Sequence, residues 1–136
     1  MRSPHLDEAP PGAVHVGREI LEIDEASGVV RLAFSARPEF ANRHGNVAGG
    51  YIAAMLDSSA AAPILAFLPP EKTLMTTELH VYYLKPAPLG RLFGTGRVTE
   101  QTDRDVFSEA ELSDPDGNVV AHATATFRLL RRREPA

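Results

Sequence analysis

One segment of this chain has the length and composition of a long helix, and any fold must place it. Residues 49–67 are rich in alanine, a strong helix former, and most of the other side chains there are small. We expect this helix to begin at Gly49. A kink or an early end is expected near Pro63, because a proline nitrogen cannot donate to the carbonyl of Ser59. Pro69 and Pro70 then stop the helical run.

The rest of the chain has the patterns of strands and turns. Residues 29–37 alternate between apolar and polar side chains, which predicts a strand with one buried face. Gly94 and Gly96 lie inside another predicted strand and indicate either a bulge or close packing against the helix. The sequence DPDG at residues 114–117 predicts a hairpin turn. Further strands are predicted at residues 14–24, 73–84, 91–101, 105–113 and 118–130.

The predicted elements follow the order β-β-α-β-β-β-β, and this order favours one architecture. An antiparallel sheet must cover its apolar face, and the helix is the only candidate within the chain. We therefore predict an α+β fold in which a curved antiparallel sheet of about six strands wraps around one long central helix. One helix rarely covers such a sheet completely, so pairing with a second subunit is expected. This domain spans residues 14–130, between a loose proline-rich and acidic arm at 1–13 and a basic tail at 131–136.

Composition excludes several classes of protein. The 136 residues suit one domain, and the lack of cysteine excludes disulfides, thiolate metal sites and a cysteine nucleophile. No His and Asp cluster has the spacing of a metal site. The net charge of −4 argues against a protein devoted to nucleic acid. The first residues lack the apolar stretch of a secretory signal, and no apolar run approaches the ~20 residues of a membrane span. We therefore expect a cytoplasmic protein.

Two features of the predicted helix could carry chemistry. The amide protons of Gly49 and Gly50 have no partner within the helix, and together with the helix dipole they could hold a developing oxyanion. Asp57 is a lone carboxylate in an alanine-rich helix, which costs free energy unless it reaches water or a partner. It could act as a nucleophile or a general base, and burial would raise its pKa. The alternative interpretation is a flexible helix entrance and one exposed charge.

The spacing of these groups limits how they can act together. Eight residues at a rise of ~1.5 Å place Asp57 about 12 Å along the helix from Gly49. A base or nucleophile must lie ~3 Å from the atom that the oxyanion donors also hold. If both groups are catalytic, we expect them to come from different subunits of a dimer with antiparallel helices.

The chain resembles a known family through several motifs with consistent spacing. These are Asn42-x-x-Gly45-x-x-x-Gly49-Gly50, Asp57, Thr76-x-Glu78-Leu79, Tyr83-Leu84-Lys85-Pro86 and a late Asp-x-Asp-Gly hairpin. Over roughly residues 14–130 the sequence resembles the hot-dog-fold acyl-CoA thioesterases, with the phenylacetate-degradation (PaaI-like) type as the nearest branch. The resemblance implies hydrolysis of an acyl- or aryl-CoA thioester to the free acid and CoA. It implies no cofactor, because CoA is part of the substrate.

The resemblance also implies roles for individual residues. Asp57 would be the nucleophile or the general base, and the Gly49 amide would polarise the thioester carbonyl. Asn42 would orient water or the thioester, and Thr76 would hydrogen-bond water near Asp57. The sites would lie at the interface of a homodimer, and such dimers often pair into homotetramers. The candidates for substrate binding are Gly50, His44, Tyr51, Met55 and Arg104.

One departure from the family pattern bears on activity. The family commonly has His-Gly-Gly where this chain has Ala48 before its two glycines, and alanine has no side-chain hydrogen-bonding group. His44, four residues earlier, is a candidate to take that place. Ala48 favours an alternative of another class, a non-catalytic acyl-CoA-binding protein, whereas Asp57 and Asn42 count against it. A hot-dog enoyl-CoA hydratase is less favoured, because no aspartate is followed by histidine five residues later.

Overall fold

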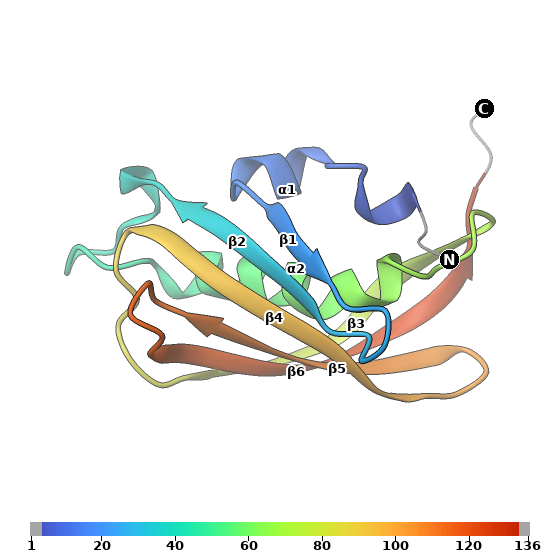
Figure 1. Ribbon diagram of the computed structural model, residues 1–136. Helices are drawn as coiled ribbons and strands as arrows, with labels where there is room; N and C mark the ends of the chain where they lie inside the picture. The colour runs from blue at the N-terminus through green and yellow to red at the C-terminus, as the bar shows by residue number, and fades with distance from the viewer. Residues whose placement is uncertain (1–3, 134–136) are drawn as a thin grey trace.

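A computed structural model describes residues 4–133 of the chain. Six strands form one antiparallel sheet in the order β1-β2-β4-β5-β6-β3, and the sheet curves around a single long helix (Figure 1). The predicted α+β fold is therefore confirmed. Its elements are η1 (Pro4–Leu6), α1 (Pro11–His15), β1 (Glu19–Ile23), β2 (Val30–Ala36), η2 (Pro38–Phe40), α2 (Gly49–Leu65), β3 (Lys72–Tyr83), β4 (Gly90–Gln101), β5 (Asp105–Ser113) and β6 (Val119–Arg131).

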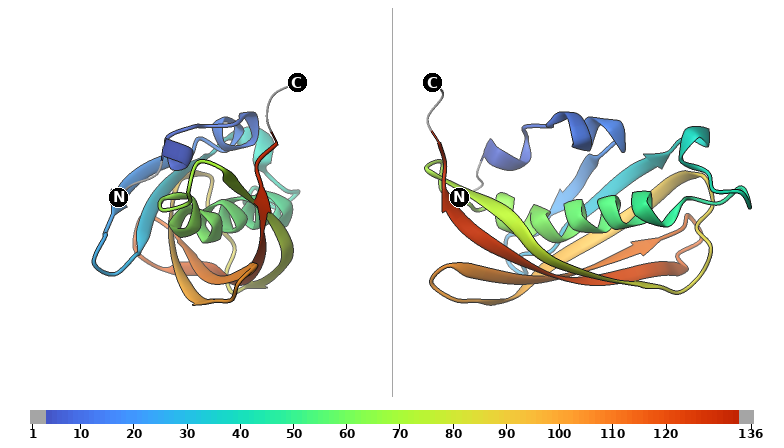
Figure 2. Two further views of the ribbon diagram at one scale, coloured as in Figure 1. Left: turned by 90° about the vertical axis from the view of Figure 1, so that its right-hand side faces the viewer. Right: turned by 180° about the vertical axis from the view of Figure 1, so that it is seen from behind.

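The core lies between the concave face of the sheet and α2. Alternate residues of β2 turn the fully buried Leu32 and Phe34 toward the helix, as their spacing predicts. Phe127 of β6 is fully buried as well, and Leu56 of α2 has no exposed surface. The end-on view shows the strands curving around α2 (Figure 2, left). Burial of these side chains fixes the helix in the groove of the sheet.

The two glycines of β4 allow the helix to approach the sheet closely. A Cβ added at Gly96 would lie 2.8 Å from the carbonyl carbon of Ser59 and 3.2 Å from Cδ of Pro63. Pro63 cannot donate to that carbonyl, so the helix presents a carbonyl without its usual i+4 donor directly to the β4 backbone. The strand pairing is regular at Gly94 and Gly96, so of the two predictions close packing is correct. The helix continues through Pro63 and ends at Leu65.

The N-terminal segment differs from the prediction. Residues 11–15 form the short helix α1, and the strand predicted at 14–24 covers only Glu19–Ile23. Gly17, with a φ of 66°, separates the two elements in a conformation that favours glycine. The predicted loose arm is wrong for the described residues, because Leu6 is fully buried and η1 contacts α2. Arg18 Nη2 donates to the carbonyl of Leu6 at 2.8 Å, which holds the arm in place.

The C-terminal basic segment lies only partly within the described residues. Arg131 ends β6, and the backbone of Arg132 donates to the carbonyl of Glu71 at 2.8 Å. The predicted tail residues 134–136 lie outside the described part of the chain. Within residues 4–133, no helix has both the length and the apolar character to cross a membrane.

Candidate active site

Asp57 lies on the side of α2 that faces β3, and a hydrogen bond fixes its carboxylate. Thr76 Oγ1 donates to Asp57 Oδ1 at 2.8 Å. Burial raises the pKa of Asp57 above its usual value, and the hydrogen bond from Thr76 opposes this rise in pKa. Among residues 4–133 no cation forms an ion pair with Asp57. The site therefore holds a partly buried carboxylate that is a stronger base than one in water.

A bulge in β3 gives Thr76 its direction. The pairing of β3 with β6 shifts register between Thr76 and Glu78, and Thr77 Oγ1 donates to a β6 carbonyl at 3.1 Å. An extra residue in one strand reverses the alternation of side chains beyond it. Thr76 and Tyr83 are an odd number of residues apart, yet both reach α2. Without the bulge, one of the two would face away from the helix.

The start of α2 leaves backbone donors available. The flanking loop is held by Val47 N, which donates to a carbonyl at 2.9 Å, and by Ala48 N, which donates to Phe40 O at 2.8 Å. Ala48 provides no side-chain cap. Within residues 4–133, no backbone carbonyl accepts the N–H of Gly49 or Gly50, and both residues are exposed. These N–H groups can therefore bind an acceptor from outside the chain.

A hollow of about 430 Å³ opens beside this helix start. Asn42, His44, Gly49, Tyr83 and Lys85 are among the residues that line it. Asn42 Oδ1 accepts from the backbone of His44 at 2.9 Å and from a second loop amide at 3.2 Å. The oxygen of Asn42 therefore shapes the loop, which leaves its amide nitrogen as the group to donate to a ligand. His44 and Lys85 are exposed and add the basic side chains of the hollow.

The structure gathers the predicted site residues into two groups. Asn42 and His44 lie with the glycines at the start of α2, and Thr76 lies with Asp57 farther along. Because α2 is continuous from Gly49 to Leu65, the separation of about 12 Å between Gly49 and Asp57 follows from helical rise. A single chain therefore cannot place both groups on one carbonyl.

Three residues predicted to bind substrate lie elsewhere. Met55 is fully buried in the core. Tyr51 stacks on Phe40, with ring centroids 4.0 Å apart. Arg104 belongs to the loop between β4 and β5. That loop is at the opposite end of the molecule from the start of α2 (Figure 1). Tyr83, which no sequence motif marked as a site residue, donates through its Oη to the carbonyl of Gly49 at 2.7 Å.

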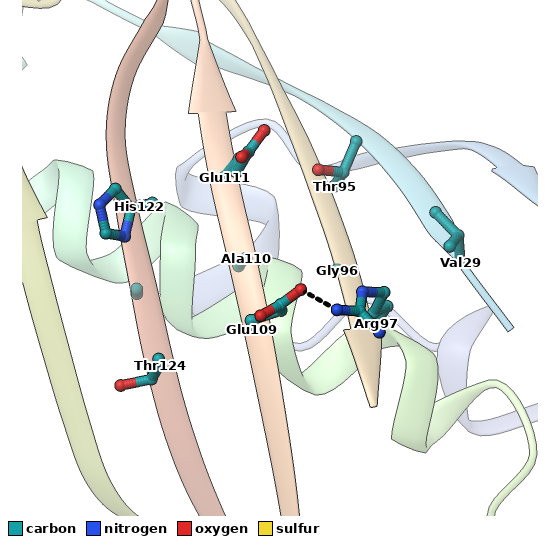
Figure 3. Close-up of a pocket in the computed structure, with 10 residues that line it drawn as sticks. Val29, Thr95, Gly96, Arg97, Glu109, Ala110, Glu111, His122 and Thr124 are labelled. Carbon is teal, nitrogen blue, oxygen red and sulfur yellow. Dashed lines mark ion pairs between the residues drawn. The ribbon is translucent and has the colours of Figure 1, made fainter. Parts of the chain in front are cut away.

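Another hollow, of about 580 Å³, lies on the outer face of the sheet over β4, β5 and β6. Arg97 and Glu109 form an ion pair across it (Figure 3). His122 also lines it, and its ring stacks on Tyr82 at 4.8 Å between centroids. None of the residues that line this hollow belongs to α2 or to the loop before it. No group of three or more His, Asp or Glu among residues 4–133 could hold a metal ion.

The chain is similar to known proteins over most of its length. The sequence profile of the thioesterase superfamily matches residues 44–121, a range that contains Gly49, Asp57 and Thr76. A curated relative from Saccharolobus solfataricus, named as an esterase, is 25% identical over 118 residues, which cover 87% of this chain and 82% of the relative.

Solved structures are similar over most of the chain. A protein of Ralstonia eutropha JMP134, assigned as a thioesterase related to phenylacetic acid degradation, is 32% identical with a TM-score of 0.86. The match covers 92% of this chain and 96% of that protein. A Bacillus halodurans protein solved with CoA is 24% identical with a TM-score of 0.76, over 89% of this chain and 78% of its own. The second likeness shows the fold alone.

Proposed function

The chain belongs to the thioesterase superfamily as a thioester hydrolase, and on this premise we propose that it hydrolyses an acyl- or aryl-CoA thioester to the free acid and CoA. The observation that carries the proposal is the partly buried Asp57 carboxylate held by Thr76 at 2.8 Å. The Ralstonia protein is related to phenylacetic acid degradation, which supports an aryl or acyl group as the acid part of the proposed substrate. The CoA bound to the Bacillus protein supports CoA as the thiol part of the proposed thioester substrate.

Asp57 is proposed to act as the general base. Its raised pKa makes the carboxylate a better proton acceptor, and Thr76 fixes one of its oxygens, while no residue among 4–133 donates a hydrogen bond to the other. The carboxylate removes a proton from water as the water oxygen bonds to the thioester carbonyl carbon. The C–S bond then breaks, and the departing CoA sulfur takes up a proton. The N–H of Gly49 or Gly50 stabilises the negative charge on the carbonyl oxygen meanwhile.

Direct attack by Asp57 is the alternative first step. It would form a mixed anhydride with the acyl group and release CoA before water enters. A single turnover in ¹⁸O-labelled water tests for this step. Label in the Asp57 carboxylate demonstrates an anhydride that water opens at the Asp57 carbonyl carbon. The general-base route, like an anhydride opened at its acyl carbon, places the label in the acid product.

The complete site is proposed to need two subunits. Gly50, Ala54 and Asp57 follow one another at helical spacing, so they share one face of α2, and Ala54 is exposed there. Two antiparallel helices that bring Gly50 of one subunit to Asp57 of the other must have their two-fold axis beside Ala54. Within residues 4–133, β3 pairs only with β6, and its exposed Met75 adds apolar surface for a partner. We propose a homodimer, or a dimer of such dimers.

A non-catalytic acyl-CoA-binding protein is the second candidate. Ala48 favours it, because the side-chain group usual at this position is missing. His44 lines the same hollow as Gly49 and is proposed to supply the missing polar group.

Release of free thiol from a panel of acyl- and aryl-CoA thioesters tests the proposal. The wild type should release thiol from at least one substrate, and Asp57→Ala should reduce its kcat by about 10²-fold or more. Asp103→Ala, at an exposed aspartate in the loop between β4 and β5, serves as the control and should match the wild type. If the wild type binds acyl-CoA but does not hydrolyse it, the second candidate, a non-catalytic acyl-CoA-binding protein, is correct. A fully active monomer in sedimentation equilibrium would exclude the two-subunit site.

A further inference from the structure

Tyr83 contacts the first residue of α2 from the end of β3. Its Oη donates to the carbonyl oxygen of Gly49 at 2.7 Å. The ring also lies against Gly49, since a Cβ added there would be 3.4 Å from Oη and 3.5 Å from Cε1. Tyr83 lines the hollow at the helix start together with His44 and Lys85. Its hydroxyl therefore lies at the edge of the space that the proposed substrate would occupy.

The hydrogen bond acts on a peptide group that carries a free donor. The carbonyl of Gly49 and the N–H of Gly50 belong to the same peptide. A donor on the carbonyl oxygen polarises the peptide and strengthens the N–H on its other side as a donor. The N–H of Gly50 has no backbone acceptor among the described residues. The effect of Tyr83 is therefore passed to a donor that is available to a ligand.

The same contact restricts motion where the chain is least constrained. Two successive glycines have more conformational freedom than any other pair, and Ala48 supplies no side-chain cap to hold them. Tyr83 is itself anchored, because β3 pairs with β6 through Tyr83. An aromatic side chain on a paired strand therefore fixes the first helical turn through a carbonyl and, unlike a cap, leaves its N–H groups available.

From these observations we infer that Tyr83 is a positioning residue for thioester hydrolysis, one that aims and polarises the Gly49–Gly50 peptide so that the N–H of Gly50 stabilises the oxyanion. The inference rests on the proposed function. It names Gly50 as the donor on which Tyr83 acts, and it gives Tyr83 no direct contact with the reacting atoms. Tyr82 provides a matched control, because it is the adjacent tyrosine on the same strand and its ring stacks on His122 on the outer face.

Kinetics of Tyr83→Phe and Tyr82→Phe in the full chain provide the first test. Loss of the hydroxyl keeps the ring in place, so Tyr83→Phe should lower kcat by roughly three- to tenfold, the effect of one hydrogen bond. Its KM should stay within about twofold, because the polarised peptide acts mainly on the transition state. Tyr82→Phe should match the wild type. An unchanged kcat in Tyr83→Phe, or a rise in KM alone, would refute the positioning role.

The infrared carbonyl band of a bound ¹³C-labelled thioester provides the second test, in an Asp57→Ala background that prevents turnover. A weaker oxyanion donor polarises the carbonyl less, so adding Tyr83→Phe should shift the band to higher frequency, and adding Tyr82→Phe should leave it unmoved. This test works even if the wild type only binds acyl-CoA. The proposed function then fails, and with it the role of Tyr83 in hydrolysis, while the band still shows whether Tyr83 strengthens the N–H of Gly50 as a donor. A band that does not move overturns the inference alone, and failure of the protein to bind any acyl-CoA overturns both.

Discussion

Replacement of Gly96 by alanine should force α2 away from β4. The new Cβ would lie 2.8 Å from the carbonyl carbon of Ser59, and the carbonyl oxygen is closer still. Non-bonded carbon atoms pack at about 3.5–4.0 Å, so helix and strand must separate by roughly 0.7 Å or more. The obstructing group is backbone in the middle of α2, and no side-chain rotation relieves the clash. The loss of stability should therefore reach the upper end for an overpacked core, about 3 kcal/mol.

The same displacement should reduce activity. Ser59 follows Asp57 closely on α2, so a shift of the helix at Ser59 also moves the Asp57 carboxylate. A misplacement of ~1 Å costs on the order of 10²-fold in rate. Gly96→Ala is therefore expected to lower kcat/KM by about 10- to 100-fold, although Gly96 lies in the sheet and contacts no proposed substrate group.

Thermal unfolding followed by circular dichroism measures the effect on stability. Gly96→Ala should lower Tm by roughly 10 °C. Gly12→Ala, where an added Cβ meets no atom within 4 Å, is the control and should leave Tm nearly unchanged. Gly94→Ala should cost less, because the nearest atom is the Ser59 hydroxyl, a side-chain group that can rotate. Ser59→Ala should recover part of the loss in Gly94→Ala and none in Gly96→Ala.

Two results would refute this account of the packing. A Tm for Gly96→Ala within about 2 °C of the Gly12→Ala control would mean that helix and strand do not touch through their backbones. Equal recovery of both glycine variants by Ser59→Ala would mean that the Ser59 side chain, and not its carbonyl, is the obstruction.

Three further changes test the candidate site. Burial raises the pKa of Asp57 in the folded state, so its ionised form lowers the stability of the fold at neutral pH, and this cost disappears as the pH falls below the pKa of Asp57 in the unfolded chain. Asp57→Asn should therefore abolish turnover and raise Tm at pH 7, and the gain in Tm should vanish in acid. An equal gain in Tm at all pH values would contradict this account. Thr76→Val removes the hydrogen-bond donor to Asp57 and should raise the pH at which kcat reaches half its plateau in a pH–rate profile. A profile that does not move would show that this hydrogen bond does not lower the pKa of Asp57. The chain has no cysteine, so a single introduced cysteine can pair only with its copy in a second subunit. Ala54→Cys should form a disulfide-linked dimer on mild oxidation, seen in non-reducing electrophoresis, whereas Ala26→Cys in the exposed turn between β1 and β2 should not. An Ala54→Cys variant that stays monomeric would show that the two-fold axis of the dimer does not lie beside Ala54.

Local patterns predicted most of the fold. The alanine-rich segment from Gly49 onward forms the helix, and the alternation at 29–37 forms β2, because periods of about 3.6 and 2 residues are visible in a short stretch. The same reasoning failed at the N-terminus. Leu6 looked like part of a loose arm, yet it is buried against α2, since the sheet leaves that side of the helix open.

The candidate site was predictable only in part. The lone carboxylate in an alanine-rich helix pointed to Asp57, and the resemblance to thioesterases placed Thr76 near it. The helical rise predicts that Gly49 and Asp57, if both are catalytic, act in different subunits. Met55 and Tyr51 are side chains of the kind that line apolar pockets. Met55 is instead fully buried in the core, and Tyr51 stacks on Phe40. Apolar side chains on a helix look alike in sequence, and only the packing of the neighbouring elements decides which of them face a ligand.

The sequence by itself determined that one small-residue helix would lie against an antiparallel sheet, because hydrophobic periodicity and glycine and proline positions act over a few residues. Only the tertiary structure decided which side chains of β3 meet that helix. The bulge between Thr76 and Glu78 arises from pairing with β6, about 50 residues away in the chain, and it reverses the alternation. Through it Thr76 reaches Asp57 and Tyr83 reaches Gly49, contacts that no local pattern encodes.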